Sequence, residues 1–178
     1  KGAVEPAAAN PGTRVEVRDL FFATPARLKF LKSARAERDA AVDAVARLAM
    51  AYPAIAFTVT ADEGRALLRL DPVGPSLVPV DARRERLAAI LGRDFTDNAV
   101  TIEAERQGAV LTGLAGLPTF NRATSRDQYL FVNGRPVRDK LLAGTVRGAY
   151  ADFLARDRHP MVALFLELPE TELDVNVH

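Results

Sequence analysis

The pattern of apolar and polar positions divides the chain into two stretches. In the first, Val15 and Val17 alternate with charged neighbours, which predicts a strand with one buried face. The Thr-Pro pair at residues 24–25 predicts a helix start, because Thr can cap free backbone N–H groups and Pro is tolerated at the first helical position. Apolar residues recur at helical spacing from residue 37 to about 50, and Pro53 ends that helix.

After Pro53 the pattern changes to short alternating runs that predict strands. These runs lie at residues 55–60, 68–70, 100–104, 110–114, 129–132 and 161–168, and another extended element begins at 175. One helix is expected after Asp81, which can cap it, with Gly92 at its end, and a second from Asp139 to about Leu154. This order predicts an α+β fold with a mostly antiparallel sheet, and a boundary that separates residues 1–52 from 53–178.

The run from Tyr129 to Val132 is apolar on both faces, which is typical of a central strand. Asn133-Gly134 follows it and is a strong signal for a tight hairpin turn. Within the last expected helix, Gly144 and Gly148 share a face. They either let the helix approach the sheet closely or only weaken the helix.

Composition narrows the function classes without naming one. The chain has 178 residues, 48% of them hydrophobic, and 24 basic against 23 acidic residues, so overall charge gives no argument for nucleic acid. Cysteine is absent and there are two His, which excludes disulfides and makes a His-rich metal site unexpected. No apolar run has membrane-spanning length and the start does not resemble a signal peptide, so we expect no membrane contact and a cytoplasmic location.

Local charge is more informative around the expected hairpin. Arg135 follows the turn and should stand at the exposed end of a rigid strand. Four more basic residues lie nearby against two acidic ones: Arg122, Arg126, Arg138 and Lys140, with Asp127 and Asp139. Arginines clustered on a turn suit phosphate backbones, and no base-reading helix is evident, so contact with DNA should be sequence-independent. The alternative is an ordinary solvated hairpin.

Few other residues suggest chemistry. Gly12 would let the backbone approach a ligand and the Thr13 hydroxyl can donate and accept hydrogen bonds, although a plain turn before a strand has the same residues. The carboxylates between 167 and 174 are expected to be solvated rather than to bind metal. No nucleophile–His pair and no glycine-rich phosphate loop are evident, so we expect no catalytic residue and no metal ligand in this chain.

Three separated strings give the chain a family resemblance. They are GTRVEVRDLFFATPARLKFL at 12–31, QYLFVNGRPVRDKLL at 128–142 and DVNVH at 174–178. Together they resemble MutL-type DNA mismatch repair proteins, from about Gly12 to His178. One departure is Ala23, where most members have Asn, so any hydrogen bond of that Asn is missing here.

The resemblance implies a more detailed fold. Residues 1–52 would be the end of an ATPase domain of the GHKL superfamily, an α/β sandwich, and residues 53–178 most of a transducer domain. In the family, the transducer resembles the second domain of a small-subunit ribosomal protein, with helices on one side of the sheet and a left-handed crossover. The family's next residues include a Lys that reaches the terminal phosphate of the nucleotide, and the chain stops before it.

The resemblance also implies site residues, cofactors and partners. Gly12 and Thr13 would lie beside the adenine, and Asn176 and His178 would support the phosphate-contacting loop. The family's Asn-Gly-Arg, here Asn133 to Arg135, is implicated in DNA binding, and Arg138 and Lys140 extend it. ATP and Mg²⁺ would serve the parent protein, with neither held by this chain alone. Expected partners are DNA, a MutS-like mismatch sensor and a second copy, as a homodimer.

Two alternatives stay open at this point. The chain could be the transducer region of another GHKL protein such as a topoisomerase ATPase subunit, which should lack the LFFATPAR and VNGRPVRDK strings. It could also be a non-enzymatic nucleic-acid-binding module of the same fold, which would have no reason to carry the Gly12-Thr13 segment. The parent is expected to be an ATPase, whereas this chain alone is not expected to hydrolyse ATP.

Overall fold

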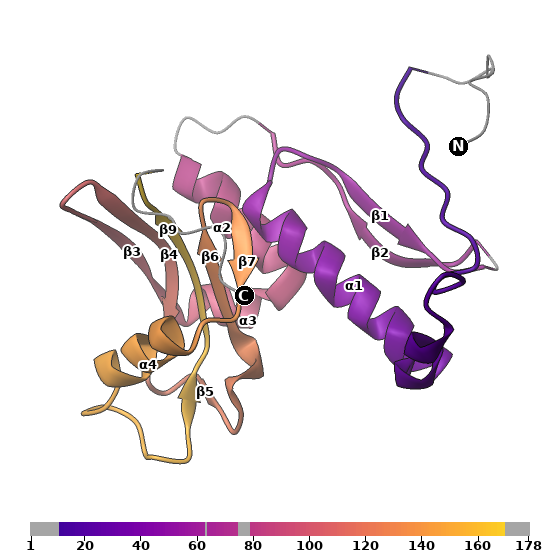
Figure 1. Ribbon diagram of the computed structural model, residues 1–178. Helices are drawn as coiled ribbons and strands as arrows, with labels where there is room; N and C mark the ends of the chain where they lie inside the picture. Colours follow the sequence, from indigo (N-terminus) through magenta and orange to yellow (C-terminus); the bar gives the residue numbers. More distant parts are fainter. Residues whose placement is uncertain (1–10, 63, 75–78, 170–178) are drawn as a thin grey trace. The chain divides into compact units, whose positions relative to one another are not determined.

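The computed structural model describes residues 11–62, 64–74 and 79–169 of the chain (Figure 1). These residues fall into two compact units, Lys1–Glu37 and Arg38–His178. Helix α1 (Ala34–Ala51) begins in the first unit and continues into the second. No helix among the described residues is both long enough and apolar enough to cross a bilayer.

The first unit corrects two expectations. Its described part contains the 3₁₀ helix η1 (Pro25–Phe30), with Pro at its start as expected, but the Thr24 side chain makes no capping hydrogen bond. The strand expected around Val15 and Val17 is absent from the described residues, and these side chains are 81% and 73% exposed. A strand needs a neighbour for its backbone groups and its apolar face, and no described segment pairs with this one.

The second unit alternates helices and short strands. Its further elements are β1 (Phe57–Thr60), β2 (Ala66–Leu70), α2 (Pro79–Leu91), α3 (Arg93–Asp97), β3 (Ala99–Arg106), β4 (Ala109–Gly116), β5 (Asn121–Arg122), η2 (Ser125–Asp127), β6 (Gln128–Val132), β7 (Arg135–Val137), α4 (Lys140–Ala149), β8 (His159–Pro160) and β9 (Val162–Glu167).

Most expected strands and helices are confirmed, and the differences are at their ends. Helix α2 starts at Pro79, so Asp81 lies in its first turn and is not its cap. Helix α4 ends at Ala149 rather than near Leu154, and Tyr150 closes it by donating its backbone N–H to the carbonyls of Arg147 and Gly148. A glycine in the last turn lowers the helix propensity there, which favours the early end.

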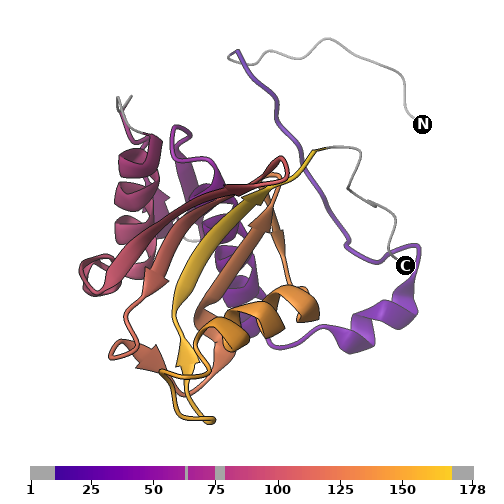
Figure 2. The ribbon, with the colours of Figure 1, turned by 90° about the vertical axis from the view of Figure 1, so that its left-hand side faces the viewer.

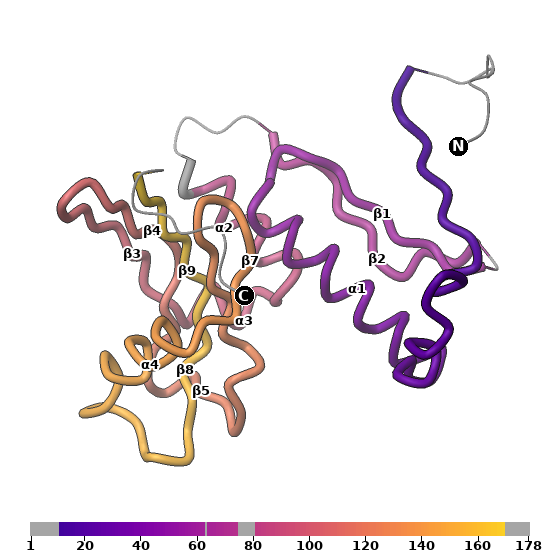
Figure 3. The backbone as a smooth tube through the Cα atoms, viewed as in Figure 1, coloured from indigo at the N-terminus to yellow at the C-terminus, as the bar shows by residue number. Residues whose placement is uncertain are grey.

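A five-stranded sheet is the centre of the unit, in the order β3-β4-β9-β6-β7. All neighbours are antiparallel except β6 and β9, so the expected mixed, mainly antiparallel fold is confirmed, and β6 is an internal strand. Parallel neighbours require a crossover, because a tight turn can join only antiparallel strands. Figure 3 traces this connection from β6 through β7, α4 and β8 to β9.

Helices cover both faces of this sheet, which corrects the expectation that they would lie on one. Leu114 and Ala115 are neighbours in β4, and their side chains point to opposite faces, because successive residues in a strand alternate. Leu114 belongs to a buried cluster with residues of α1, α2 and α3, whereas Ala115 belongs to one with Val146 of α4. Figure 2 shows α4 and α2 on opposite sides of the strands.

The β1–β2 hairpin is tied to α2 by a buried arginine. Arg86 is 1% exposed, and its Nη2 donates to the carbonyl oxygens of Pro53, Ile55 and Asp71 at 2.6, 2.8 and 2.9 Å. Burial lowers the pKa of the Arg86 guanidinium, while the nearby carboxylate of Asp71 partly offsets this effect. A charge-assisted set of hydrogen bonds therefore fixes the ends of the hairpin.

The glycines of β4 are closely packed, whereas those of α4 have open space around them. Gly113 has φ +134°, and a Cβ there would collide with the carbonyl oxygen of Ala163 in the adjacent strand. A Cβ on Gly116 would lie 2.7 Å from the Met161 oxygen. By contrast, nothing lies within 4 Å of a Cβ built on Gly144 or Gly148, so close approach of the helix does not explain them.

Candidate nucleic-acid interface

The β6–β7 hairpin is a rigid turn that presents Arg135. Asn133 and Gly134 have φ values of 45° and 74°, the left-handed conformations that a two-residue hairpin turn requires. The Asn133 amide also joins the turn to the end of β9: its Nδ2 donates to the Leu168 oxygen at 2.9 Å, and its Oδ1 accepts from the Leu168 N–H at 2.7 Å. Arg135 opens β7 opposite Val132, and its side chain is exposed.

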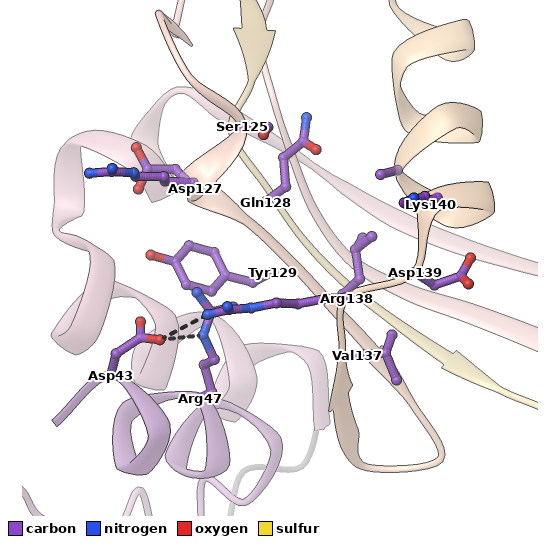
Figure 4. Close-up of a pocket in the computed structure, with 13 residues that line it drawn as sticks. Asp43, Arg47, Ser125, Asp127, Gln128, Tyr129, Val137, Arg138, Asp139 and Lys140 are labelled. Carbon is purple, nitrogen blue, oxygen red and sulfur yellow. Dashed lines mark hydrogen bonds and ion pairs between the residues drawn. The ribbon is translucent and has the colours of Figure 1, made fainter. Parts of the chain in front are cut away.

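A cavity of about 610 Å³ lies beside this hairpin (Figure 4). Four chain segments enclose it: α1, η2 with the start of β6, the end of β7, and the start of α4. Its lining comprises Asp43, Arg47, Ser125, Arg126, Asp127, Gln128, Tyr129, Leu130, Val137, Arg138, Asp139, Lys140 and Ala143. Four of these side chains are basic and three are acidic, so charge dominates its chemistry.

Each of the three acidic side chains is engaged within the protein. Asp43 binds Arg47 and Arg138. Asp127 pairs with Arg122 at 3.3 Å, and Asp139 caps α4 by accepting the Leu142 N–H at 2.8 Å. These contacts neutralise or orient the carboxylates, which weakens their repulsion of an incoming anion.

The basic side chains are more available. Arg126, Arg135 and Lys140 form no hydrogen bond or ion pair with any other residue that the structure describes, and all three are exposed. Arg122 is different: it pairs with Asp127 and its guanidinium lies 4.4 Å from the centre of the Phe120 ring. Of the basic group found in the sequence, Arg122 is therefore committed to the fold, whereas the others face solvent.

One wall of the cavity is formed by the Tyr129 ring, with the Arg47 side chain stacked over it. The Arg47 guanidinium stands 4.7 Å from the centre of the Tyr129 ring, a cation–π distance. Burial, and next the negative charge of Asp127, raise the pKa of the Tyr129 hydroxyl. Tyr129 therefore remains a neutral hydrogen-bond donor across the physiological range.

The structure brings only part of the sequence-predicted DNA site together. Arg138 and Lys140 line the cavity with Arg126, while Arg135 is exposed on β7 and does not line it. Asn133 is occupied by Leu168 and braces the turn. Sequence reasoning missed Asp43 and Arg47. Their spacing of four residues signals an ion pair on a helix, but not that the pair faces β7.

The predicted nucleotide residues lie in the first unit or outside the described residues. Gly12 has φ +141°, with open space around the position of a Cβ, and Thr13 is exposed. Asn176 and His178 lie outside the described residues. Within the described part of the chain, no group of three His, Cys, Asp or Glu side chains could hold a metal ion.

A second cavity, of about 510 Å³, has different chemistry. It lies on the α4 face of the sheet, between strand residues such as Ile102 and Leu164 and α4 residues such as Val146 and Ala149. None of the described residues that line it is charged, so it lacks the groups that would bind a phosphate.

Comparison with known proteins gives the family. The model of the DNA mismatch repair protein C-terminal domain matches residues 87–178. The whole chain is 62% identical to the DNA mismatch repair protein MutL of Rhodospirillum rubrum and 60% identical to that of Paramagnetospirillum magneticum. It covers 28% and 29% of these proteins, so it spans under a third of their length.

Solved structures agree with this result. The ATPase domain of the mismatch repair endonuclease MutL from Aquifex aeolicus matches with a TM-score of 0.60 and 27% identity, over 90% of this chain and 54% of that one. A structure described as the N-terminal domain of a DNA repair protein matches with a TM-score of 0.69 over 89% of this chain and 50% of that one; at 21% identity it shows the fold alone. The chain therefore belongs to the family of MutL-type DNA mismatch repair proteins.

Proposed function

We propose that this chain is the part of a mismatch repair protein that couples ATP binding to sequence-independent DNA binding. The DNA surface consists of Arg135 on β7 and three of the four basic side chains that line the charged cavity, namely Arg126, Arg138 and Lys140. One observation carries the proposal. These cations come from three separate segments, yet three of the four have no described partner, while the carboxylates among them are engaged internally.

Phosphate contact fits this chemistry better than base reading. The basic groups lie in η2, in and directly after the edge strand β7, and in the first turn of α4. Exposed Arg and Lys at these places can reach a phosphate backbone without entering a groove. Binding by such groups releases counterions, so affinity should fall steeply with salt. Asn133 acts by holding the turn, since both polar atoms of its amide already bond to Leu168.

The nucleotide side of the proposal rests on residues 1–52, as the end of a GHKL-type ATPase domain. Support comes from the Aquifex aeolicus ATPase domain, which matches 90% of this chain. Of the residues that the resemblance assigns to the nucleotide site, the structure describes only the Gly12-Thr13 pair, and open space surrounds the position of a Cβ at Gly12.

Residues 53–178 are proposed to be the transducer domain, with a ribosomal-protein-like fold and a left-handed β6–β9 crossover. Support for the boundary is that α1 ends at Ala51 and β1 starts at Phe57. In the intact protein, ATP with Mg²⁺ would close two copies into a dimer, and a MutS-like mismatch sensor would be a further partner. A nucleotide-dependent shift of this kind is a two-state equilibrium biased by ligand contact.

A titration of mixed-sequence duplex DNA into the intact protein, with and without a non-hydrolysable ATP analogue, tests this proposal. We expect the analogue to tighten DNA binding by about fivefold or more, the lower range of typical coupling between sites. DNA binding of equal strength with and without the analogue would support a nucleic-acid-binding module without nucleotide control instead. Absence of salt-sensitive DNA binding would remove the proposed DNA surface.

A further inference from the structure

Two arginines share one carboxylate oxygen at the wall of the charged cavity. Oδ2 of Asp43 lies 2.8 Å from Nε of Arg47 and 3.6 Å from Nη2 of Arg138. Figure 4 shows Arg138 extending along the cavity toward this pair. One negative charge thus faces two positive charges, and the cluster has an unbalanced positive charge that an anion could satisfy.

The two contacts of Asp43 differ in strength. Arg47 is 14% exposed, hydrogen-bonded to Asp43 and held over Tyr129. Arg138 is 82% exposed, and its distance of 3.6 Å exceeds that of a hydrogen bond. Exposed ion pairs of this kind contribute little stability. Arg138 can therefore leave Asp43 easily, and Asp43 then still has Arg47 as its partner.

The space around Arg138 allows such a movement. A groove of about 470 Å³ separates α1 from β7, and Arg138 lines both this groove and the charged cavity. Its α1 side includes the small side chains of Ala40 and Ala44. The contact of Asp43 with Arg138 therefore crosses a loosely packed seam, where a small displacement of α1 would change it.

We infer that Asp43 is an internal competitor for the DNA phosphate, and this inference rests on the proposed DNA binding. Without DNA, Arg138 rests on Asp43. When a backbone phosphate enters the cavity, Arg138 transfers to it and joins Arg126 and Lys140, while Asp43 keeps Arg47. Because α1 carries Asp43 and also continues from the first unit, a shift of α1 against β7 would set how readily Arg138 is released.

The test is the affinity of the intact protein for a mixed-sequence DNA duplex at low salt, without nucleotide. Asp43→Asn keeps the shape of the side chain and removes its charge, so we expect binding to tighten by about threefold or more. Asp152→Asn, beyond the opposite end of α4, removes the same charge and should change affinity by less than about 1.5-fold. Asp43→Ser should act in the same direction as Asp43→Asn, which excludes an effect of the new amide. Thermal melting confirms that each variant is folded.

A double-mutant cycle separates competition from a general charge effect. In an Arg138→Ala background, Asp43→Asn should leave affinity unchanged within about 1.5-fold, because the two residues act through one contact. An equal gain with and without Arg138, or no gain in its presence, would overturn the inference. If the unmodified protein binds DNA in a salt-sensitive manner and only the Asp43 effect is missing, the proposed function stands. If the unmodified protein does not bind DNA, both fall.

Discussion

At the scale of single residues, two glycines show how surroundings decide the effect of a substitution. Gly113→Ala places a methyl group against the Ala163 carbonyl at a positive φ, so we expect it to lower the free energy of unfolding by more than about 2 kcal/mol. Gly144 lies in the interior of α4, and a Cβ there meets open space, so Gly144→Ala should raise the free energy of unfolding by about 0.5–1 kcal/mol. Urea denaturation measures both values, and the same sign for the two would contradict the described packing.

Tyr150 provides a prediction about pH. Its hydroxyl donates to the Gly116 oxygen at 2.6 Å, and burial raises its pKa above the ordinary value. The folded state therefore holds this proton more tightly than the unfolded state, and the stabilisation is fully present below about pH 10 and is lost as pH rises through the raised pKa. Tyr150→Phe should cost about 1 kcal/mol at pH 8 and flatten the alkaline decline.

Tyr129 also has a raised pKa and contributes to the same decline, so Tyr150→Phe should reduce the slope without abolishing it. Unfolding measured between pH 8 and 11 gives the slope. An unchanged slope in Tyr150→Phe would contradict the assigned hydrogen bond and burial.

Residue-level predictions from sequence succeeded where the determinant is local. Asn133 and Gly134 take the left-handed conformations expected from their identities, and a helix begins directly after Asp139, close to its expected start. The burial of Arg86 and the contact of Asp43 with Arg138 could not be predicted. Each depends on partners far away along the chain, 15 to 33 residues for Arg86, and a basic residue looks the same in sequence whether it is solvated or buried.

At the scale of elements, the end of β9 holds the β6–β7 turn. Asn133→Ala removes both hydrogen bonds to Leu168 and places a less tolerant residue at φ 45°, so we expect a loss of about 1–3 kcal/mol in unfolding free energy. Asn133→Gly keeps the backbone conformation and loses only the side-chain bonds, so it should cost less. If Asn133→Gly costs at least as much as Asn133→Ala, backbone strain at this turn is not part of the effect.

Strand prediction followed from alternation wherever the strand found a neighbour. The strands expected at 100–104 and 110–114 form as the antiparallel pair β3 and β4, because the two partners are adjacent in sequence. The expected strand at Val15 and Val17 has the same alternation but no described partner, and it remains extended chain with exposed side chains. Alternation of apolar and polar residues thus indicates that a segment can form a strand. The segment becomes a strand only where a neighbouring strand is available to pair with it.

At the scale of the whole molecule, periodicity predicted the class of fold but not the layers. The parallel pairing of β6 with β9 is not visible in their sequences, because any two apolar strands could be neighbours. Helices cover both faces of the sheet because one set of strand positions packs against α2 and the other against α4. The path of the chain determines this arrangement. The function was predicted from family resemblance and not from hydrophobic periodicity. The strings at 12–31 and 128–142 resemble MutL-type DNA mismatch repair proteins, and the family model matches residues 87–178.

The central claim is that the hairpin and the charged cavity form a phosphate-binding surface, and the salt dependence of DNA affinity tests it most directly. Arg135→Glu should weaken duplex binding about tenfold at low salt and reduce the slope of log affinity against log salt by about one. Arg156→Glu, a matched reversal beyond the far end of α4, should leave both values near those of the unmodified protein. Unchanged low-salt affinity in Arg135→Glu, or an equal loss in Arg156→Glu, would contradict the account.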